Sequence, residues 1–420
     1  MTQTPELSYR ALFAVPEIPR ILTGMIVARI AGAMVSVAIV LFTLAEYQSA
    51  ELAGLVTFVA IMPGLLVSPI AGALLDRHGR TRLVVLDYAV GAISMALIGV
   101  LAIAGDLPAW LLVVIAGVSS LTQPLSNTGL RSLFPIIVPP PLWGRVNALD
   151  SNGYLVSTLV GPPIAAILVQ VIGGPETLLI IGVMFAIAAV ILLGVPDPTS
   201  APSSAGSSVL RDAWAGVVYV WRNRTTRGLA YTMSTLNVST GVLTIAIPII
   251  VLNRLHESPA LVGVAWAVAG ACGIVTGLMF GRRDSHGREK RWLVWSTFGY
   301  AISMALLLVN YSVPVLLLSM AIGGLLNGPL DIALFTIRQR RVDPAWLGRA
   351  IAVSASLNFS GYPIGSAISG ALVERSLELT ILVGVGAALL ASFFGWWQIP
   401  READETAYRP VDEQSLPVTS

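Results

Sequence analysis

The chain has 420 residues, of which 55% are hydrophobic and only 11% are charged, and its formal net charge is +2. A soluble domain carries about 25% charged residues, so this composition excludes an ordinary soluble protein. The small net charge gives no indication of nucleic-acid binding.

Runs of about 20 apolar residues can cross a bilayer as helices, and turn and charge breaks divide the chain into twelve such runs. We therefore predict an all-α membrane protein with twelve transmembrane helices. The predicted spans are 21–45, 52–75, 83–104, 108–137, 147–173, 176–195, 226–253, 259–281, 292–310, 313–341, 348–374 and 378–399. The predicted domains are a six-helix bundle over 1–195, a linker over 196–225, a second six-helix bundle over 226–400 and a polar tail over 401–420.

The connection between the second and third spans is a charged hairpin in a chain that is otherwise poor in charge. Its residues are Gly72, Asp76, Arg77, Gly79, Arg80 and Arg82. Part of this pattern recurs at Gly277, and Gly144-Arg145 recurs as Gly348-Arg349. The two offsets, 205 (277 − 72) and 204 (348 − 144), are nearly equal and predict a duplicated six-helix unit.

Basic residues are concentrated in every second loop, whereas the remaining loops hold only Arg254 and Arg375. By the positive-inside rule, this asymmetry places both chain termini in the cytoplasm and the protein in a bacterial inner membrane. After the flexible linker, Trp214, Val217, Val218 and Trp221 share one helical face. We expect a short helix there that lies on the inner leaflet.

The sequence gives no sign of a metal site, a cofactor site or an enzyme. The single cysteine, Cys272, excludes an intrachain disulfide and a cysteine metal site. The histidines, His78, His256 and His286, fall in separate predicted loops. No phosphate-binding loop and no nucleophile–base pair is visible, so we expect neither ATP-driven transport nor catalysis.

Twelve spans, a central linker, the charged hairpin and its degenerate repeat together resemble the major facilitator superfamily. The resemblance covers about residues 10–400 and implies two pseudo-symmetric six-helix bundles around a central cavity, with transport by rocking of the halves. Within the superfamily, the chain is similar to the bacterial drug:proton antiporters, including macrolide and tetracycline-type exporters. The matching residues are Pro124, 131–135 (Arg-Ser-Leu-Phe-Pro), 144–149 (Gly-Arg-Val-Asn-Ala-Leu) and Gly161-Pro162.

Two departures from that branch affect the expected coupling. Gly161 and Pro162 resemble the exporter motif of the fifth helix, but Ala165 and Ala166 replace its glycine pair. The first helix has no acid after Arg29, where members of the branch often carry one. The partners that the resemblance implies are a small-molecule substrate, protons and the lipid bilayer, and we expect a monomer.

Asp331 is the strongest candidate for a proton carrier, because an acid within a transmembrane span usually has a functional reason to be there. It could instead bind a cationic compound, pair with Arg29, or belong to a polar patch at Gly328-Pro329. Arg29 could pair with an acid, attract an anionic substrate or snorkel to the interface. Asn127, Asn327 and Gln123 could bind substrate or join helices.

The charged hairpin resembles the gate loop of the family, in which Asp76 would cap the eleventh helix and latch the two halves together. The alternative is a loop that only sets topology. Candidate gate partners are Asp87, Arg131, Arg145 and Asp150. We expect Asp87 and Asp150 to be structural partners of the basic loops, where Asp150 could pair with Arg80 or Arg145, with a carrier role for both acids as the alternative.

The sequence therefore favours proton-coupled export of a small lipophilic compound. One alternative is an exporter or flippase of an endogenous molecule such as a siderophore or lysolipid, in which Arg29 would anchor an anionic group. Another is a membrane sensor that does not transport, although it would have no need of an intact gate loop.

Overall fold

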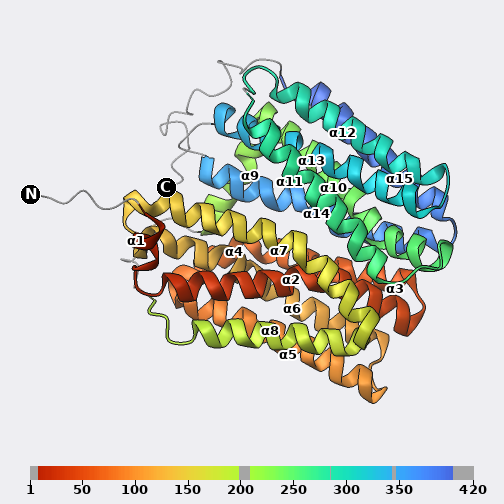
Figure 1. Cartoon of the computed structure of the whole chain (residues 1–420). Coiled ribbons are helices and arrows are strands. Elements are labelled where there is room, and N and C mark those ends of the chain that lie inside the picture. The colour runs from red at the N-terminus through yellow and green to blue at the C-terminus, as the bar shows by residue number, and fades with distance from the viewer. Residues whose placement is uncertain (1–7, 198–208, 284, 343–346, 401–420) are drawn as a thin grey trace, which may run out of the picture.

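The computed structural model describes residues 8–197, 209–283, 285–342 and 347–400, and these ranges are helical apart from short connections (Figure 1). The first half of the chain forms α1 (Tyr9–Phe13), α2 (Ile18–Tyr47), α3 (Ala50–Val59), α4 (Met62–His78), α5 (Arg80–Ala104), α6 (Ala109–Ile137), η1 (Pro140–Leu142), α7 (Trp143–Ile172) and α8 (Gly174–Leu192). The second half forms α9 (Val209–Arg222), α10 (Arg224–Ile249), η2 (Ile250–Arg254), α11 (Ala260–Gly281), α12 (Glu289–Ala305), η3 (Leu306–Leu308), α13 (Val313–Arg341), α14 (Leu347–Val373) and α15 (Leu377–Gln398).

Eleven helical segments of the described chain are long and apolar enough to cross a membrane. The 27-residue helix α14 occupies the place of the remaining predicted span. A helix satisfies its interior backbone hydrogen bonds within itself, as a bilayer core without water requires. The prediction of twelve transmembrane helices is confirmed, and the helix ends agree with the predicted spans to within a few residues.

The two halves repeat the same helix pairs. In the first half, α2 packs on α7 and α8, α5 packs on α6 and α8, and α4 packs on α6. In the second half, α10 packs on α14 and α15, α12 packs on α13 and α15, and α11 packs on α13. The halves lie one above the other in Figure 1, and their matching pairs confirm the predicted duplication.

Glycine brings the equivalent helix pairs of the two halves into close contact. A Cβ added to Gly161 of α7 would lie 2.6 Å from Cβ of Ala33 on α2. A Cβ added to Gly361 of α14 would collide with the backbone carbonyl of Ser234 on α10. Both pairs therefore pack with no room for a side chain, which is how transmembrane helices gain dispersion energy without a hydrophobic driving force.

The second predicted span is not one helix, which corrects the continuous prediction over 52–75. It is divided at Ala60 and Ile61 into α3 and α4. Pro63 lacks a backbone N–H and its ring excludes the carbonyl of Val59, so the hydrogen-bond ladder cannot continue through this point. The first piece, α3, is thus joined to α4 by the two residues Ala60 and Ile61.

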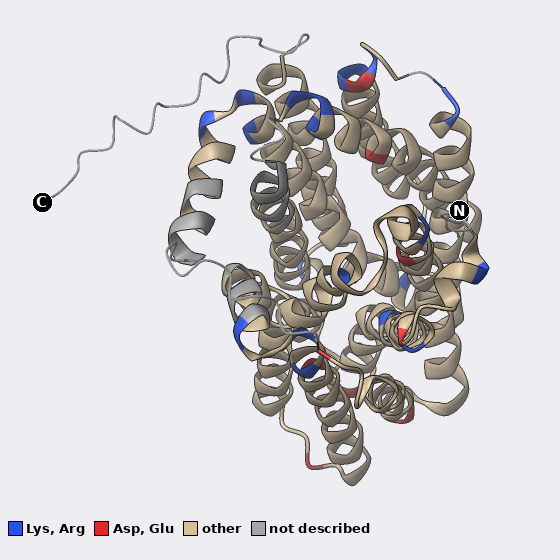
Figure 2. Cartoon of the chain, turned by 90° about the vertical axis from the view of Figure 1, so that its left-hand side faces the viewer, with Lys and Arg blue, Asp and Glu red and all other residues tan. Residues whose placement is uncertain are grey.

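The two ends of the bundle differ in charge and in packing. Figure 2 views the end that carries α1 and α9, where most of the basic residues gather, and we call it the basic end. The opposite end, with the α2–α3, α5–α6 and α14–α15 connections, is called the far end. One buried hydrophobic cluster joins both halves towards the far end. Towards the basic end each half has a separate cluster, so the main apolar contact between the halves lies towards the far end.

Candidate functional site

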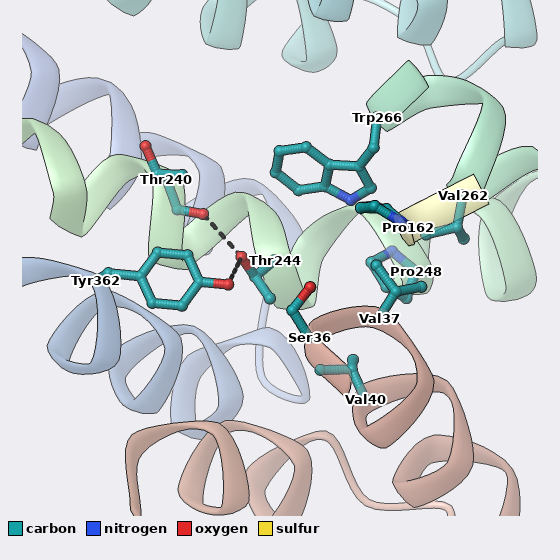
Figure 3. A pocket seen from close by; sticks show the side chains of 10 residues that line it. All are labelled: Ser36, Val37, Val40, Pro162, Thr240, Thr244, Pro248, Val262, Trp266 and Tyr362. Atoms are coloured by element: carbon teal, nitrogen blue, oxygen red, sulfur yellow. Dashed lines mark hydrogen bonds between the residues drawn. The ribbon is translucent and has the colours of Figure 1, made fainter. Parts of the chain in front are cut away.

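A cavity of about 110 Å³ lies between the two halves, on the inner side of the far-end contacts (Figure 3). Five helices contribute to it: α2 and α7 from the first half, and α10, α11 and α14 from the second. The lining residues are Ser36, Val37, Val40, Pro162, Thr240, Thr244, Pro248, Val262, Trp266 and Tyr362. Of the charged residues in the described chain, none lines it.

The polar atoms of the cavity are hydroxyl groups and one indole N–H. The Thr244 hydroxyl lies 2.9 Å from the Tyr362 hydroxyl and 3.1 Å from the Thr240 carbonyl. The Ser36 hydroxyl donates to the Ala33 carbonyl at 2.7 Å, which leaves its oxygen as an acceptor towards the cavity. Figure 3 shows Tyr362 and Trp266 on different sides of the space. Such a lining suits an uncharged, largely apolar molecule with a few hydrogen-bonding groups.

The sequence reasoning found only Pro162 among the lining residues. Asp331, Arg29, Asn127, Asn327 and Gln123 lie elsewhere. A usable signal was present in the sequence, because Thr240 and Thr244 are one helical turn apart within an apolar span. Trp266 also stands inside the α11 span rather than at its end, where tryptophan usually anchors a helix to the interface.

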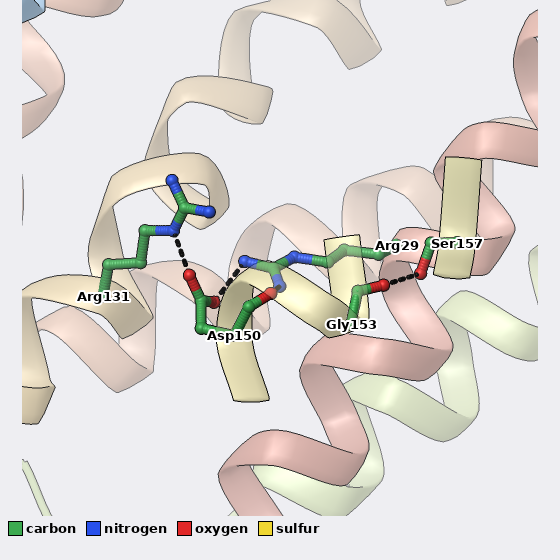
Figure 4. A network of polar contacts seen from close by, with 5 residues as sticks. All are labelled: Arg29, Arg131, Asp150, Gly153 and Ser157. Atoms are coloured by element: carbon green, nitrogen blue, oxygen red, sulfur yellow. Dashed lines mark hydrogen bonds and ion pairs between the residues drawn. The ribbon is translucent and has the colours of Figure 1, made fainter. Parts of the chain in front are cut away.

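A buried carboxylate with two arginines lies nearer the basic end of the first half (Figure 4). Asp150 of α7 is 6% exposed, and its Oδ1 is 2.6 Å from Nη2 of Arg29 on α2. Its Oδ2 is 2.7 Å from Nε of Arg131 on α6, and Arg29 Nη1 also donates to the Asp150 carbonyl at 2.8 Å. Two charge-assisted partners compensate the burial of this carboxylate and join three helices.

This network corrects two expected pairings. Asp150 contacts Arg29 and Arg131, and not Arg80 or Arg145. Arg29 is therefore engaged by Asp150, and not by Asp331. Arg145 instead lies over the ring of Tyr9 in α1, with its guanidinium carbon 6.0 Å from the ring centroid. The expected pairs were wrong because helix spacing does not reveal which faces of α2, α6 and α7 converge.

Asp331 lies on α13, with its side chain exposed. Within the described chain no basic side chain lies within ion-pair distance of it. Asp331 is four residues from Asn327 and seven from Arg338, so all three fall on one side of the helix. Arg338 is buried and donates from Nη2 to the Ser354 hydroxyl of α14 at 3.0 Å.

The gate loop is reduced to one residue between two helices. α4 ends at His78, α5 begins at Arg80, and Gly79 between them has a φ of +94°. The carboxylate of Asp197 accepts a hydrogen bond from the Thr81 backbone N–H at 3.0 Å, a contact that the sequence analysis did not predict. The side chain of Asp76 and the surroundings of Gly72 lie outside the described part of the chain. The capping role of Asp76 therefore stays a prediction.

The remaining candidates lie apart from one another, most of them in the first half and Asn327 on α13 of the second. Asp87 is buried in α5 beside Ser126 and Thr122 of α6. Gln123 Nε2 donates to the Ala60 carbonyl at 3.4 Å, at the break between α3 and α4. The side chains of Asn127, Asn327, Arg77 and Arg82 are exposed. The structure thus brings Arg29, Arg131 and Asp150 together.

Comparison with known proteins identifies relatives along the whole chain. The family model described as Major Facilitator Superfamily matches residues 21–282 and 228–420. The uncharacterised MFS-type transporter y4rN of Sinorhizobium fredii is 35% identical over 92% of this chain and 96% of its own length. The multidrug efflux pump Tap of Mycobacterium tuberculosis is 25% identical over 80% and 82% of the two chains. A crystal structure of the nucleoside transporter NupG superposes with a TM-score of 0.75 at 13% identity, covering 91% of this chain and 99% of that one.

Proposed function

The chain belongs to the Major Facilitator Superfamily, and from this premise we propose that it exports a small lipophilic compound across the bacterial inner membrane in exchange for protons. Membership of a family of transporters means that the chain is not an enzyme. The observation that carries the proposal is the uncharged cavity between the halves, lined by hydroxyl, aromatic and aliphatic groups. The similarity to a multidrug efflux pump supports export.

Alternating access is the proposed mode of transport, and the packing of the two halves supports it. With the basic end in the cytoplasm, as the positive-inside rule favours, the shared apolar contact between the halves lies on the outer side, and the proposed open side is the cytoplasmic one. A compound would enter from the cytoplasm or the inner leaflet and occupy the cavity. The two halves of the monomer would then rock relative to each other and expose the cavity to the outer side.

Asp331 is the proposed proton carrier, because its exposed side chain has no basic partner in the described chain. In the proposed cycle, Asp331 releases its proton towards the cytoplasm and takes up another when the outer side opens. Asp150 is a less suitable carrier, since two guanidinium groups already stabilise its charge. The same engagement of Arg29 removes the anchor that an anionic siderophore or lysolipid would need.

The test is proton movement in inside-out vesicles with an acidic lumen, challenged with lipophilic cations, neutral antibiotics including macrolides, and lysolipids. We expect one compound to trigger proton efflux from the wild type and none from Asp331→Asn. Efflux that persists in Asp331→Asn would place the carrier elsewhere. A protein that is stabilised by a compound but moves neither protons nor compound would support the sensor and contradict export.

A further inference from the structure

The carboxylate of Glu374 crosses from the second half to the first at the far end. Glu374 directly follows α14, and its Oε1 accepts hydrogen bonds from the backbone N–H groups of Ala50 at 2.9 Å and Glu51 at 3.3 Å. These are the first two residues of α3. The first N–H groups of a helix have no partner within the helix, and its dipole favours an anion there.

Next to this contact, α3 and α14 pack against each other through Gly54 and Gly370, and we call this contact the glycine seam. A Cβ added to Gly54 of α3 would lie 2.9 Å from Cα of Gly370 on α14, and a Cβ added to Gly370 would lie 2.6 Å from the Ala50 carbonyl. The two helices therefore touch through backbone, with no space for a side chain. The two halves are therefore in tight contact at the glycine seam, and Glu374 lies at the end of this seam that is nearest the far end of the bundle.

The other side of the far end carries an equivalent contact. Gln170, near the end of α7, accepts through Oε1 a hydrogen bond from the backbone N–H of Ala260, the first residue of α11, at 3.2 Å. Glu374 and Gln170 are 204 residues apart (374 − 170), which is one of the two offsets found for the duplicated halves. Each half thus caps a helix of the other, once with a carboxylate and once with a neutral amide.

We propose that these two crossed caps form the latch of the outer gate, and that Glu374 is its stronger member. The proposal rests on the alternating-access part of the proposed function. The carrier opens on the far side by withdrawing Glu374 from the N-terminus of α3 and Gln170 from that of α11. Because α3 is joined to α4 only through Ala60 and Ile61, it can move apart from the rest of its span.

Labelling of a cavity cysteine from the far side measures this opening directly. Cys272, the only native cysteine, is replaced by serine, and Ser36→Cys places a reporter in the cavity below the latch. A membrane-impermeant maleimide is added to right-side-out vesicles without compound or proton gradient. The labelling rate then depends on how often the far end opens, so it can be scored even if the export proposal fails.

We expect Glu374→Ala to raise the labelling rate about fivefold, as for loss of a charged helix cap. Glu374→Gln should raise it about twofold, because an amide keeps one hydrogen bond but loses the charge. Gln170→Glu should lower the rate about twofold by adding a charge at the second cap. This last change strengthens closure, so misfolding cannot imitate it.

Two further variants make the result decisive. Glu378→Gln is the matched control, since Glu378 contacts Arg254 and Tyr311 of its own half and should leave the rate unchanged. Gly370→Val forces the seam apart and should raise the rate whether or not the latch exists. An unchanged rate in Glu374→Ala, with a raised rate in Gly370→Val, would overturn the proposal.

Discussion

Asp150 in the first half and Ser354 in the second are 204 residues apart (354 − 150) and occupy equivalent places on α7 and α14, but their surroundings differ in charge. Asp150 is a buried acid held by Arg29 and Arg131. Ser354 offers only a hydroxyl to the buried guanidinium of Arg338. In the described chain, Arg338 has no acidic partner, and Asp331, two turns away on the same helix, has no basic one.

The same contrast holds in the cavity. The first half contributes Val37, Val40 and Pro162, together with the hydroxyl of Ser36. The second half contributes Thr240, Thr244, Trp266 and Tyr362, and thus most of the polar groups. The two halves of the duplicated fold have therefore diverged in their polar groups. The first half holds the ion-paired Asp150, and the second half supplies most of the hydrogen-bonding groups of the cavity.

The largest expected effect is the loss of the Asp150 carboxylate. Asp150→Ala leaves the guanidinium of Arg29 poorly solvated and without its partner, and removing one member of a buried pair costs about 3 kcal/mol. Arg131 is half exposed and can turn to solvent, so it adds little. A lower melting temperature of the purified protein, followed by tryptophan fluorescence, would record this loss.

Two variants sharpen that result. Asp331→Asn should leave the melting temperature unchanged, because Asp331 makes no ion pair with any described residue. Arg29→Met combined with Asp150→Leu should recover most of the stability, since both charges are then removed together. If Asp331→Asn destabilised the protein as much as Asp150→Ala, the contrast between the halves would not hold.

A smaller effect is expected when the second half is given the acid of the first. Ser354→Asp places a carboxylate beside Arg338, whose Nη2 is already 3.0 Å from the Ser354 hydroxyl. A charge-assisted pair should then form and stabilise the protein by about 1 kcal/mol after desolvation. The melting temperature should rise, and Ser354→Asn, which has a similar shape without the charge, should not reproduce the rise.

The fold could be predicted from the sequence because its determinants are local. The lengths of the apolar runs predicted the twelve spans, and glycine–arginine pairs at nearly equal offsets predicted the duplication. The division between α3 and α4 was missed, although Pro63 is visible in the sequence, because a proline inside an apolar run can also be absorbed as a kink. The single-residue turn at Gly79 and the hydrogen bond from Thr81 to Asp197 could not be predicted, because they depend on where the chain lies after α8.

The site was less predictable, because it depends on which helix faces converge. Charged residues drew attention to Arg29, Asp150 and Asp331, but the partner of Arg29 lies 121 positions away, and Asp331 has no ion-pair partner in the described chain. The cavity hydroxyls carry a weaker signal, the spacing of Thr240 and Thr244, since serine and threonine inside a span commonly bond to their own helix. Only the geometry of five helices places Ser36 near Tyr362.

The smallest expected effect concerns the cavity itself and tests whether the second half governs recognition. Tyr362→Phe removes one hydroxyl and its hydrogen bond with Thr244, a change of about 1 kcal/mol. The half-maximal concentration for export should rise about fivefold for compounds with a carbonyl or hydroxyl group, and should hardly change for apolar compounds of similar size. Tyr300→Phe is the matched control, because the Tyr300 hydroxyl lies 3.5 Å from that of Thr240 but does not line the cavity. Equal losses in Tyr362→Phe for both kinds of compound would mean that the hydroxyl supports packing rather than recognition.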